Sequence, residues 1–408
     1  MTEQTRGYLA VALAAGAVFA LGLGVRQSQA LFISPINSAT GIGYAAISLA
    51  FAVGQLMWGV AMPVAGAIAD RWGPRRVMLS GALLVAAATA ATPLATSAGA
   101  LVVLIGVLAA CGASAMGPGL LMSASNRWIP EVKRNMVTGI VNAGGSFGQF
   151  TVIPLAQLFI GLAGWQPAMV ILGALGLASI PLILWLTRGH AEHAASATAA
   201  PAGSLRKALA DAAKNPSYLL LTAGFFTCGF HVAFIATHLP GVVAICGLPP
   251  AVSAWSLALI GLFNIFGSLW VGNVINGRRM KFTLAWLYFA RALMILAFYF
   301  APKTALVFLL FACGIGFTYL STVPPTVGLV VKFYGMRYMA TLFGVVMLSH
   351  QVGAFFGAWL GGKAFEATGS YDWMWWADIA LCLMAAALHL PIREARPAAL
   401  PAAPAAAA

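Results

Sequence analysis

Side chains that bind anions or protons stand inside long apolar runs of this chain. They are two arginines, Arg26 and Arg291, two histidines, His231 and His350, and one acid, Asp378. A guanidinium offers a planar fork that matches a carboxylate, and an imidazole takes up a proton near neutral pH. A charge at the centre of a bilayer costs about 2.5–3.5 kcal/mol on insertion scales, so such residues are functional candidates. Together they predict a site for an anion, with a histidine as proton acceptor.

Arg26 is the leading candidate for binding the anion. It lies well inside the first apolar run, where Gln29 and Trp58 could share its environment. A structural role is the alternative, because a long arginine side chain can extend until its charge reaches the headgroup region.

Arg291 and Asp378 lie in different apolar runs at similar expected depths. Their axial separation is about 10 Å or less at about 1.5 Å per residue, within reach of an extended arginine. We therefore expect an Arg291–Asp378 ion pair that holds two helices together. Alternatively, Arg291 turns inward towards the helix at 251–274, again in a structural role. A third possibility is that Arg291 points into the central cavity and contacts the substrate.

The histidines are candidates for proton transfer. His350 lies well inside its apolar run and could accept a coupling proton or hydrogen-bond an anion. His231 and His238 are seven residues apart, so they share one face of a helix, and His231 is the second candidate. For each of them, an ordinary hydrogen-bonded histidine is the alternative.

Neutral polar residues complete the candidate binding set. They are Asn264, Tyr319 and Gln351. The alternative for each is a hydrogen bond between helices, worth about 0.6 kcal/mol. Gly357 and Gly361, four residues apart, predict a face on which two helices pack closely.

The composition shows what must position these residues. Of 408 residues, 61% are hydrophobic and only 8% are charged, with a formal net charge of +13. A soluble protein this apolar would lack a hydrated surface, so a soluble enzyme and a disordered chain are excluded. The positive residues are scattered between apolar runs, which excludes a nucleic-acid-binding domain. The sequence predicts a polytopic membrane protein.

Twelve apolar runs are long enough to span a bilayer as helices, since a span needs roughly 20 residues. They cover residues 8–33, 44–68, 77–95, 100–124, 136–160, 166–187, 217–240, 251–274, 282–300, 304–330, 339–363 and 372–391. The prediction is therefore an all-α membrane protein with twelve transmembrane helices.

A single long polar stretch divides these runs into two sets of six. We expect an N-terminal bundle at 1–187, a cytoplasmic linker at 188–216, a C-terminal bundle at 217–396 and a disordered tail at 397–408. With the N-terminus placed in the cytoplasm, eighteen of the 22 Lys and Arg residues fall on the cytoplasmic side and two on the other. This asymmetry predicts that both termini are cytoplasmic.

Sequence motifs for metal binding, phosphate binding and nucleophilic catalysis are absent from this sequence. The sequence shows no metal-ligand spacing, no phosphate-binding loop and no nucleophile elbow, so we expect no enzyme activity, no metal and no cofactor. The five cysteines lie in or at the ends of apolar runs without paired spacing, which is typical of small buried hydrophobic residues.

The loop between the second and third runs carries a motif. It reads Gly66-Ala-Ile-Ala-Asp70-Arg71-Trp-Gly73-Pro-Arg75-Arg76. It resembles the loop motif of the major facilitator superfamily. A degraded copy follows the eighth run, Gly272-Asn-Val-Ile-Asn276-Gly277-Arg278-Arg279-Met-Lys281. The resemblance implies two pseudo-symmetric six-helix bundles and alternating access, with the first motif as a conformational gate. We expect Gly66 to permit close helix approach, Gly73 to form a tight turn, and Asp70 to cap a neighbouring helix in one conformation.

Other segments resemble the monocarboxylate transporter and oxalate/formate antiporter branch. They are Arg26 to Pro35, and Asn126-Arg127-Trp128-Ile-Pro130 with the glycines that follow; we assign Arg127 to gating. His350 stands where oxalate antiporters place a substrate-binding lysine. Asn264 and Ser268 stand where this branch usually carries an acid and an arginine.

We therefore expect a transporter, with a small organic anion, a monocarboxylate above all, as substrate. A coupling proton or an exchanged anion would be the second solute, the lipid bilayer the surroundings, and nucleic acid no partner. We expect a monomer in a bacterial inner membrane. Efflux of drugs or amphipathic metabolites is the main alternative; a non-transporting sensor and an intramembrane enzyme are two others.

Overall fold

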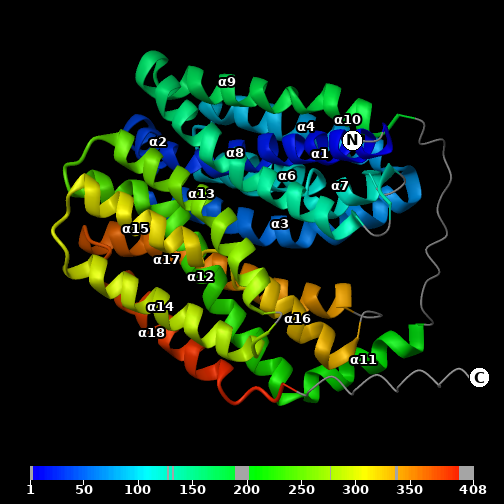
Figure 1. Cartoon of the computed structure of the whole chain (residues 1–408). Coiled ribbons are helices and arrows are strands. Elements are labelled where there is room, and N and C mark those ends of the chain that lie inside the picture. The colour runs from blue at the N-terminus through cyan, green and yellow to red at the C-terminus, as the bar shows by residue number, and fades with distance from the viewer. Residues whose placement is uncertain are drawn as a thin grey trace, which may run out of the picture.

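The computed structural model describes residues 3–125, 128–130, 133–188, 202–275, 277–335 and 339–394. Every regular element in these ranges is helical (Figure 1). The N-terminal half contains α1 (Glu3–Ser28), η1 (Gln29–Phe32), α2 (Ile33–Thr40), α3 (Tyr44–Trp72), α4 (Pro74–Ala91), η2 (Thr92–Leu94), α5 (Ala98–Leu101), η3 (Val102–Ala109), α6 (Ala110–Ala115), α7 (Pro118–Ser125), α8 (Arg134–Ala163), α9 (Trp165–Leu177) and α10 (Ser179–Leu186). The C-terminal half contains α11 (Ala202–Lys214), α12 (Pro216–Ile245), α13 (Pro250–Val274), α14 (Met280–Phe300), α15 (Ala305–Thr318), α16 (Val323–Tyr334), α17 (Met339–Thr368) and α18 (Asp372–His389).

These helices confirm the predicted fold class. Within the described residues, eleven helical stretches are long and apolar enough to cross a membrane. The twelfth predicted span is α18, which is 18 residues long, carries Asp372 and Asp378, and packs along α14 and α12. The chain thus folds as two bundles of six transmembrane helices.

Proline sets where several spans bend. The first span continues to Thr40, beyond its predicted end at residue 33. Pro35 falls in the first turn of α2, where its missing N–H is not needed, and the tighter η1 joins α1 to α2. Likewise α7 begins at Pro118, and Pro324 lies in the first turn of α16. The tenth span is therefore broken between Thr318 and Val323.

The predicted linker contains a helix in its second part. Ala208 and Ala212 of α11 are buried, and Ala212 packs into the apolar cluster of the C-terminal half. Asn215 then caps α12 through Ser217 N and donates from Nδ2 to the Tyr334 hydroxyl at 2.9 Å. Residues 189–201 and the predicted tail 397–408 lie outside the described residues.

Glycines allow the main helix pairs in each half to approach closely. A Cβ added at Gly144 or Gly148 of α8 would overlap the backbone of α1 at Gly16 and Ala20. In the other half, a Cβ at Gly357 of α17 would overlap the carbonyl of Phe230, and Gly361 faces the ring of His238. The predicted packing face on α17 is therefore confirmed, and α1–α8 is its counterpart in the first half.

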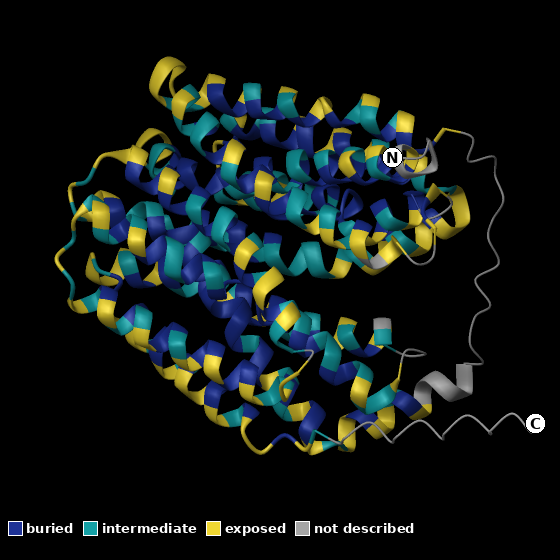
Figure 2. Cartoon of the chain, in the orientation of Figure 1, coloured by how far each residue is buried: buried dark blue, intermediate teal, exposed yellow. Residues whose placement is uncertain are grey.

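The two halves meet at one end of the molecule. The described termini lie at the other end (the termini end), and the halves diverge towards it (Figure 1). The main contacts between halves join α3 to α17 and α8 to α13, and α12 also packs against η1 and α3. Buried residues are concentrated within each half and where the halves meet (Figure 2). Towards the termini end, α3 exposes Val60, Val64 and Ile68.

Lys303, one of the two basic residues outside the predicted cytoplasmic side, has a structural role. It lies at the loop end, opposite the termini end, and its ammonium donates to the carbonyls of Phe298, Tyr299 and Ala301 at the end of α14. Burial lowers the pKa of this ammonium group. Lys303 thus caps a helix whose last carbonyls would otherwise lack donors.

The close packing of α1 on α8 predicts opposite outcomes for two glycine substitutions on one helix. Gly148→Ala would force a Cβ against the carbonyl of Ala20, whereas a Cβ at Gly161 meets nothing within 4 Å. We expect Gly148→Ala to lower the melting temperature of the purified protein by roughly 5 °C or more. Gly161→Ala should leave it unchanged or raise it slightly. Equal melting temperatures for the two variants would contradict this packing account.

Candidate functional site

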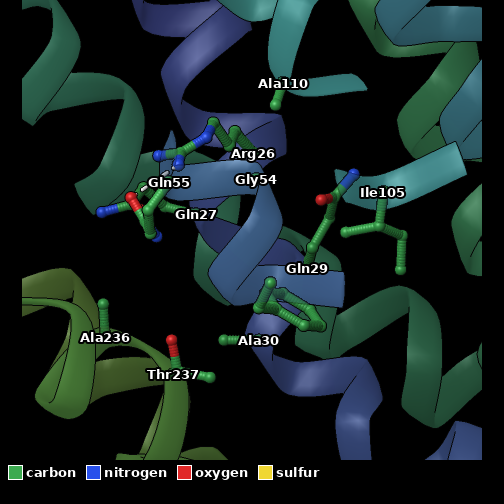
Figure 3. A pocket seen from close by; sticks show the side chains of 11 residues that line it. Arg26, Gln27, Gln29, Ala30, Gly54, Gln55, Ile105, Ala110, Ala236 and Thr237 are labelled. Atoms are coloured by element: carbon green, nitrogen blue, oxygen red, sulfur yellow. Dashed lines mark hydrogen bonds between the residues drawn. The ribbon is translucent and has the colours of Figure 1, made fainter. Parts of the chain in front are cut away.

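Arg26 is held by neutral partners from α3. Its Nη2 donates to Gln55 Oε1 at 2.8 Å (Figure 3), and its Cζ lies 4.2 Å from the centroid of the Trp58 ring. Gln55 and Trp58 are three residues apart, so they lie on one face of α3. Among the described residues no carboxylate pairs with Arg26. The guanidinium therefore retains the ability to bind an anion.

A cavity of about 20 Å³ adjoins Arg26 and is lined by both halves of the protein. Gln27 and Gln55 come from the first half, and Ala236 and Thr237 of α12 come from the second (Figure 3). This volume holds about one water molecule. A larger ligand at Arg26 therefore requires the halves to separate there.

Gln29 lines this cavity, and Gln351 lies at the interface of the halves near Trp58. Gln29 turns its amide into the first half, where Nε2 donates to Thr89 Oγ1 at 3.2 Å. Gln351 of α17 packs across the interface on Gly59, the residue after Trp58, and its buried Oε1 has no hydrogen-bond partner among the described residues. The buried indole Nε1 of Trp58 likewise finds no acceptor in the part of the chain that the structure describes. The Trp58 N–H donor and the Gln351 amide oxygen acceptor are thus available to a ligand.

Asn264 and Tyr319 bind the backbone near the break in the tenth span. Asn264 donates to Ser146 Oγ of the other half at 3.0 Å and accepts from Leu320 N at 3.0 Å. The Tyr319 hydroxyl donates to the carbonyl of Val232 at 2.9 Å. Both side chains are occupied by protein partners in this conformation.

The remaining charged residues form a buried cluster in the C-terminal half. The predicted Arg291–Asp378 pair is wrong, since Asp378 Oδ2 accepts from His231 Nδ1 at 2.7 Å. Arg291 donates instead to the carbonyls of Thr318 and Tyr319, which the helix break leaves without intrahelical donors. His231, Asp378 and Arg291 are all fully buried. This cluster does not line the Arg26 cavity.

His350 borders that cluster rather than the cavity. It is 7% exposed, and its ring centroid lies 5.1 Å from that of Phe225. Its Nδ1 has no partner among the described residues. The structure thus separates the two predicted groups of site residues: Arg26, Gln29 and Gln351 at the interface, and His231, Arg291 and His350 inside the second half.

The predicted gating loop is exposed at the termini end. Gly73 has φ +84°, donates its N–H to Ala69 at 2.8 Å and joins α3 to α4, as its expected turn requires. Asp70, Arg71, Arg75 and Arg76 are exposed, and a Cβ at Gly66 would meet nothing within 4 Å. Gly66 therefore makes no close helix contact in this conformation. Arg127 and Asn276 lie outside the described residues.

At the loop end, a carboxylate joins the two halves. Glu366 Oε2, near the end of α17, accepts from Ala45 N at the start of α3 at 2.7 Å. The N-terminus of a helix carries partial positive charge and unpaired N–H groups, so it favours this carboxylate. Neither Glu366 nor Gln55 was among the predicted site residues. Gln55 lies three residues before Trp58 on the same helix, and this spacing was the signal that could have identified it.

Comparison with known proteins agrees with this architecture. The chain matches the sequence pattern described as Major Facilitator Superfamily over residues 11–358. The chain belongs to this superfamily. Its members are transporters rather than enzymes, and this chain is a secondary transporter of that class. In fold it is similar to a D-xylose-proton symporter, with a TM-score of 0.72 over 94% of this chain and 97% of that one at 13% identity.

Three curated relatives have names that specify substrates. Monocarboxylate transporter 13 of Rattus norvegicus is 24% identical over 86% of this chain and 81% of its own. The oxalate:formate antiporter of Oxalobacter formigenes is 25% identical over 59% of this chain and 57% of its own. The hexuronate transporter of Escherichia coli strain K12 is 32% identical over 44% and 40%. These matches confirm the predicted resemblance to the monocarboxylate and oxalate/formate branch.

The Glu366 contact predicts how readily the loop end opens. Glu366→Gln replaces a charge-assisted hydrogen bond by a neutral one, and we expect amide hydrogen exchange at residues 43–50 to become roughly fivefold faster. Hydrogen–deuterium exchange of the purified protein measures this. Asp372→Asn is the matched control, because Asp372 lies at the same end in the first turn of α18. Unchanged exchange in Glu366→Gln would contradict a closing role.

Proposed function

We propose that this chain transports a small organic anion, a carboxylate, by alternating access, with Arg26 as the group that binds the carboxylate. The observation that carries the proposal is the environment of Arg26 at the interface of the halves. Its partners are an amide oxygen and an indole ring, and neither neutralises its charge. A carboxylate would do so through two parallel hydrogen bonds.

Trp58 and Gln55 support an anion at this position. The buried indole N–H of Trp58 has no acceptor within the described ranges, and leaving a buried donor unpaired costs about 1–3 kcal/mol. A carboxylate bound to Arg26 would offer that acceptor. It would displace Gln55 Oε1, a neutral acceptor, from Nη2. When a carboxylate replaces the amide oxygen of Gln55, Arg26 gains a charged acceptor and the Trp58 N–H gains the acceptor that it lacks.

The relatives point to the same substrate class. Monocarboxylates, oxalate, formate and hexuronates, which occur in the names of those relatives, all carry a carboxylate. No acid of the described residues lines the Arg26 cavity, which disfavours an organic cation. The second solute is a proton or an exchanged anion.

Orientation and gating follow from the charge distribution. With both termini in the cytoplasm of a bacterial cell, at its inner membrane, the termini end faces the cytoplasm and this conformation faces inward.

We propose residues 1–187 and 217–396 as the two moving bundles, 188–216 as their cytoplasmic linker and 397–408 as a disordered tail. Asp70 would cap a helix across the interface when the cytoplasmic side closes. The working unit is a monomer.

Transport into proteoliposomes tests the role of Arg26. We expect saturable uptake of at least one of lactate, pyruvate, oxalate, a branched 2-oxo acid or glucuronate. Arg26→Gln should lower kcat/KM on the order of 10- to 100-fold, because it removes a charge-assisted bidentate contact. Arg26→Lys should retain part of the activity, since the charge stays and the fork is lost. Arg188→Gln, at an exposed arginine, is the control.

Trp58→Phe refines the same measurement. It keeps a ring against Arg26 and removes the unpaired N–H, so we expect KM to rise by about three- to tenfold with kcat little changed. Uptake of no acid, with or without an internal exchange anion, would refute the proposal and favour efflux of amphipathic compounds. Full activity in Arg26→Gln would refute the assignment of Arg26.

A further inference from the structure

A second polar site lies inside the C-terminal half, apart from the Arg26 cavity. His231 of α12 and Asp378 of α18 form a fully buried pair, with Nδ1 and Oδ2 2.7 Å apart. The other carboxylate oxygen, Oδ1, accepts from the thiol of Cys382 at 3.8 Å. His231 Nε2 is buried and has no partner among the described residues. The pair therefore has one open position, and that position is a proton acceptor.

The tautomer of His231 follows from its partner. A carboxylate accepts hydrogen bonds, so Nδ1 carries the hydrogen in the neutral ring and Nε2 carries the lone pair. A proton from water added at Nε2 would give an imidazolium that stays bonded to Asp378. Loss of the same proton to water restores the neutral ring. No other group has to change its covalent state.

The surrounding charges limit this site to one proton. The titratable groups that gather around His231 come from several helices: Asp378 and Cys382 on α18, Arg291 and Tyr288 on α14, Tyr319 after α15, Cys228 on α12 and His350 on α17. With a neutral imidazole, the charges of Arg291 and Asp378 balance. A proton on His231 leaves one positive charge in excess, which is unfavourable in a buried site unless an anion approaches.

Tyr319 connects this cluster to Arg26. Its ring lies 6.4 Å from that of His231 in an edge-on arrangement, and its hydroxyl binds the carbonyl of the next residue, Val232. Its own carbonyl accepts from Arg291 at 3.0 Å. The guanidinium of Arg26 lies close enough to Tyr319 for a direct Coulombic interaction. An anion held by Arg26 would therefore lower the potential at the cluster, and movement at the helix break would alter both sites.

We propose that the His231–Asp378 pair is the binding site of the proton that accompanies the carboxylate. The assignment rests on the proposed function, because the anion at Arg26 supplies the compensating charge. The proton binds at Nε2 when the anion is present and leaves when the anion leaves. Since Nε2 is buried here, the proton exchanges with water only in another conformation, which ties its release to the alternation between sides.

A divalent metal is the other cation that this cluster could hold. The ligand atoms of His231, Asp378 and Cys382 lie within 4.8 Å of one another. A metal ion would need the thiolate of Cys382 and would place two charges near Arg291, whose guanidinium acts on both Asp378 and Cys382. A proton adds one charge and requires no thiolate, so it fits the cluster better.

Two measurements on proteoliposomes test the assignment. One is exchange of labelled carboxylate against unlabelled carboxylate without a pH gradient; the other is accumulation driven by a pH gradient, with an internal pH dye that counts protons. For the wild type we expect about one proton per carboxylate, because the charge balance of the cluster leaves room for one.

The variant His231→Gln can still donate a hydrogen bond to Asp378 but cannot take up a proton. It should lose gradient-driven accumulation and proton movement, while exchange falls by less than about threefold.

His238→Gln is the matched control. His238 lies on the same face of α12, is equally buried, and Nε2 bonds to the carbonyl of Ala358 at 2.6 Å rather than to an acid. It should accumulate carboxylate as the wild type does. Equal loss of coupling in both variants would overturn the assignment, as would full gradient-driven accumulation in His231→Gln.

Three wild-type results separate the remaining possibilities, even if His231→Gln does not fold. Carboxylate exchange without any proton movement would overturn the proton site and leave the proposed function intact. The absence of carboxylate exchange would refute both. One zinc ion per chain, found by elemental analysis of the protein purified without added metal, would assign the cluster to a metal instead.

Discussion

The need to pair every charge inside an apolar medium governs the interior of this protein. A bilayer offers no water to charged side chains, so each must find donors or acceptors within the protein. The two arginines do so in different ways. Arg26 lies in the last turn before the tight η1 segment and takes an amide and an indole as partners. Arg291 occupies backbone carbonyls that a helix break exposes. The first arrangement can be exchanged for a ligand, whereas the second binds Arg291 to the backbone through Nη2.

The two halves share a framework but use it differently. Glycines bring α1 onto α8 and α12 onto α17, which gives each half a rigid central pair. In the first half, the polar groups of this framework face the interface. In the second half, His231 of α12 faces inward to Asp378, whereas Thr237 and Gln351 lie at the interface. Tyr319, at the broken tenth span, donates from its hydroxyl to Val232 of α12 and accepts from Arg291 through its carbonyl.

Much of the fold could be predicted from sequence because it follows from hydropathy and a loop motif. Runs of apolar residues locate the spans closely except at the end of the first, which continues to Thr40, and the motif around Asp70 identifies the superfamily. The environment of Arg26 was partly predictable, since Trp58 was expected beside it. The partner of Asp378 was not. Axial rise gives the depth of a residue, whereas pairing depends on how each helix is rotated about its axis. Glu366 was missed because nothing distinguishes one acid near a span end from another until its neighbour is known.

The contact of Glu366 has a consequence for how this protein can evolve. The donor is the backbone N–H of Ala45, so any residue other than proline at position 45 supplies it equally well. Position 45 is then free to drift, while position 366 is confined to a side chain that accepts this bond. Among related sequences the two positions would show no correlated change. An analysis of covariation would overlook this contact between the two halves at the loop end, although selection would act on it at one position.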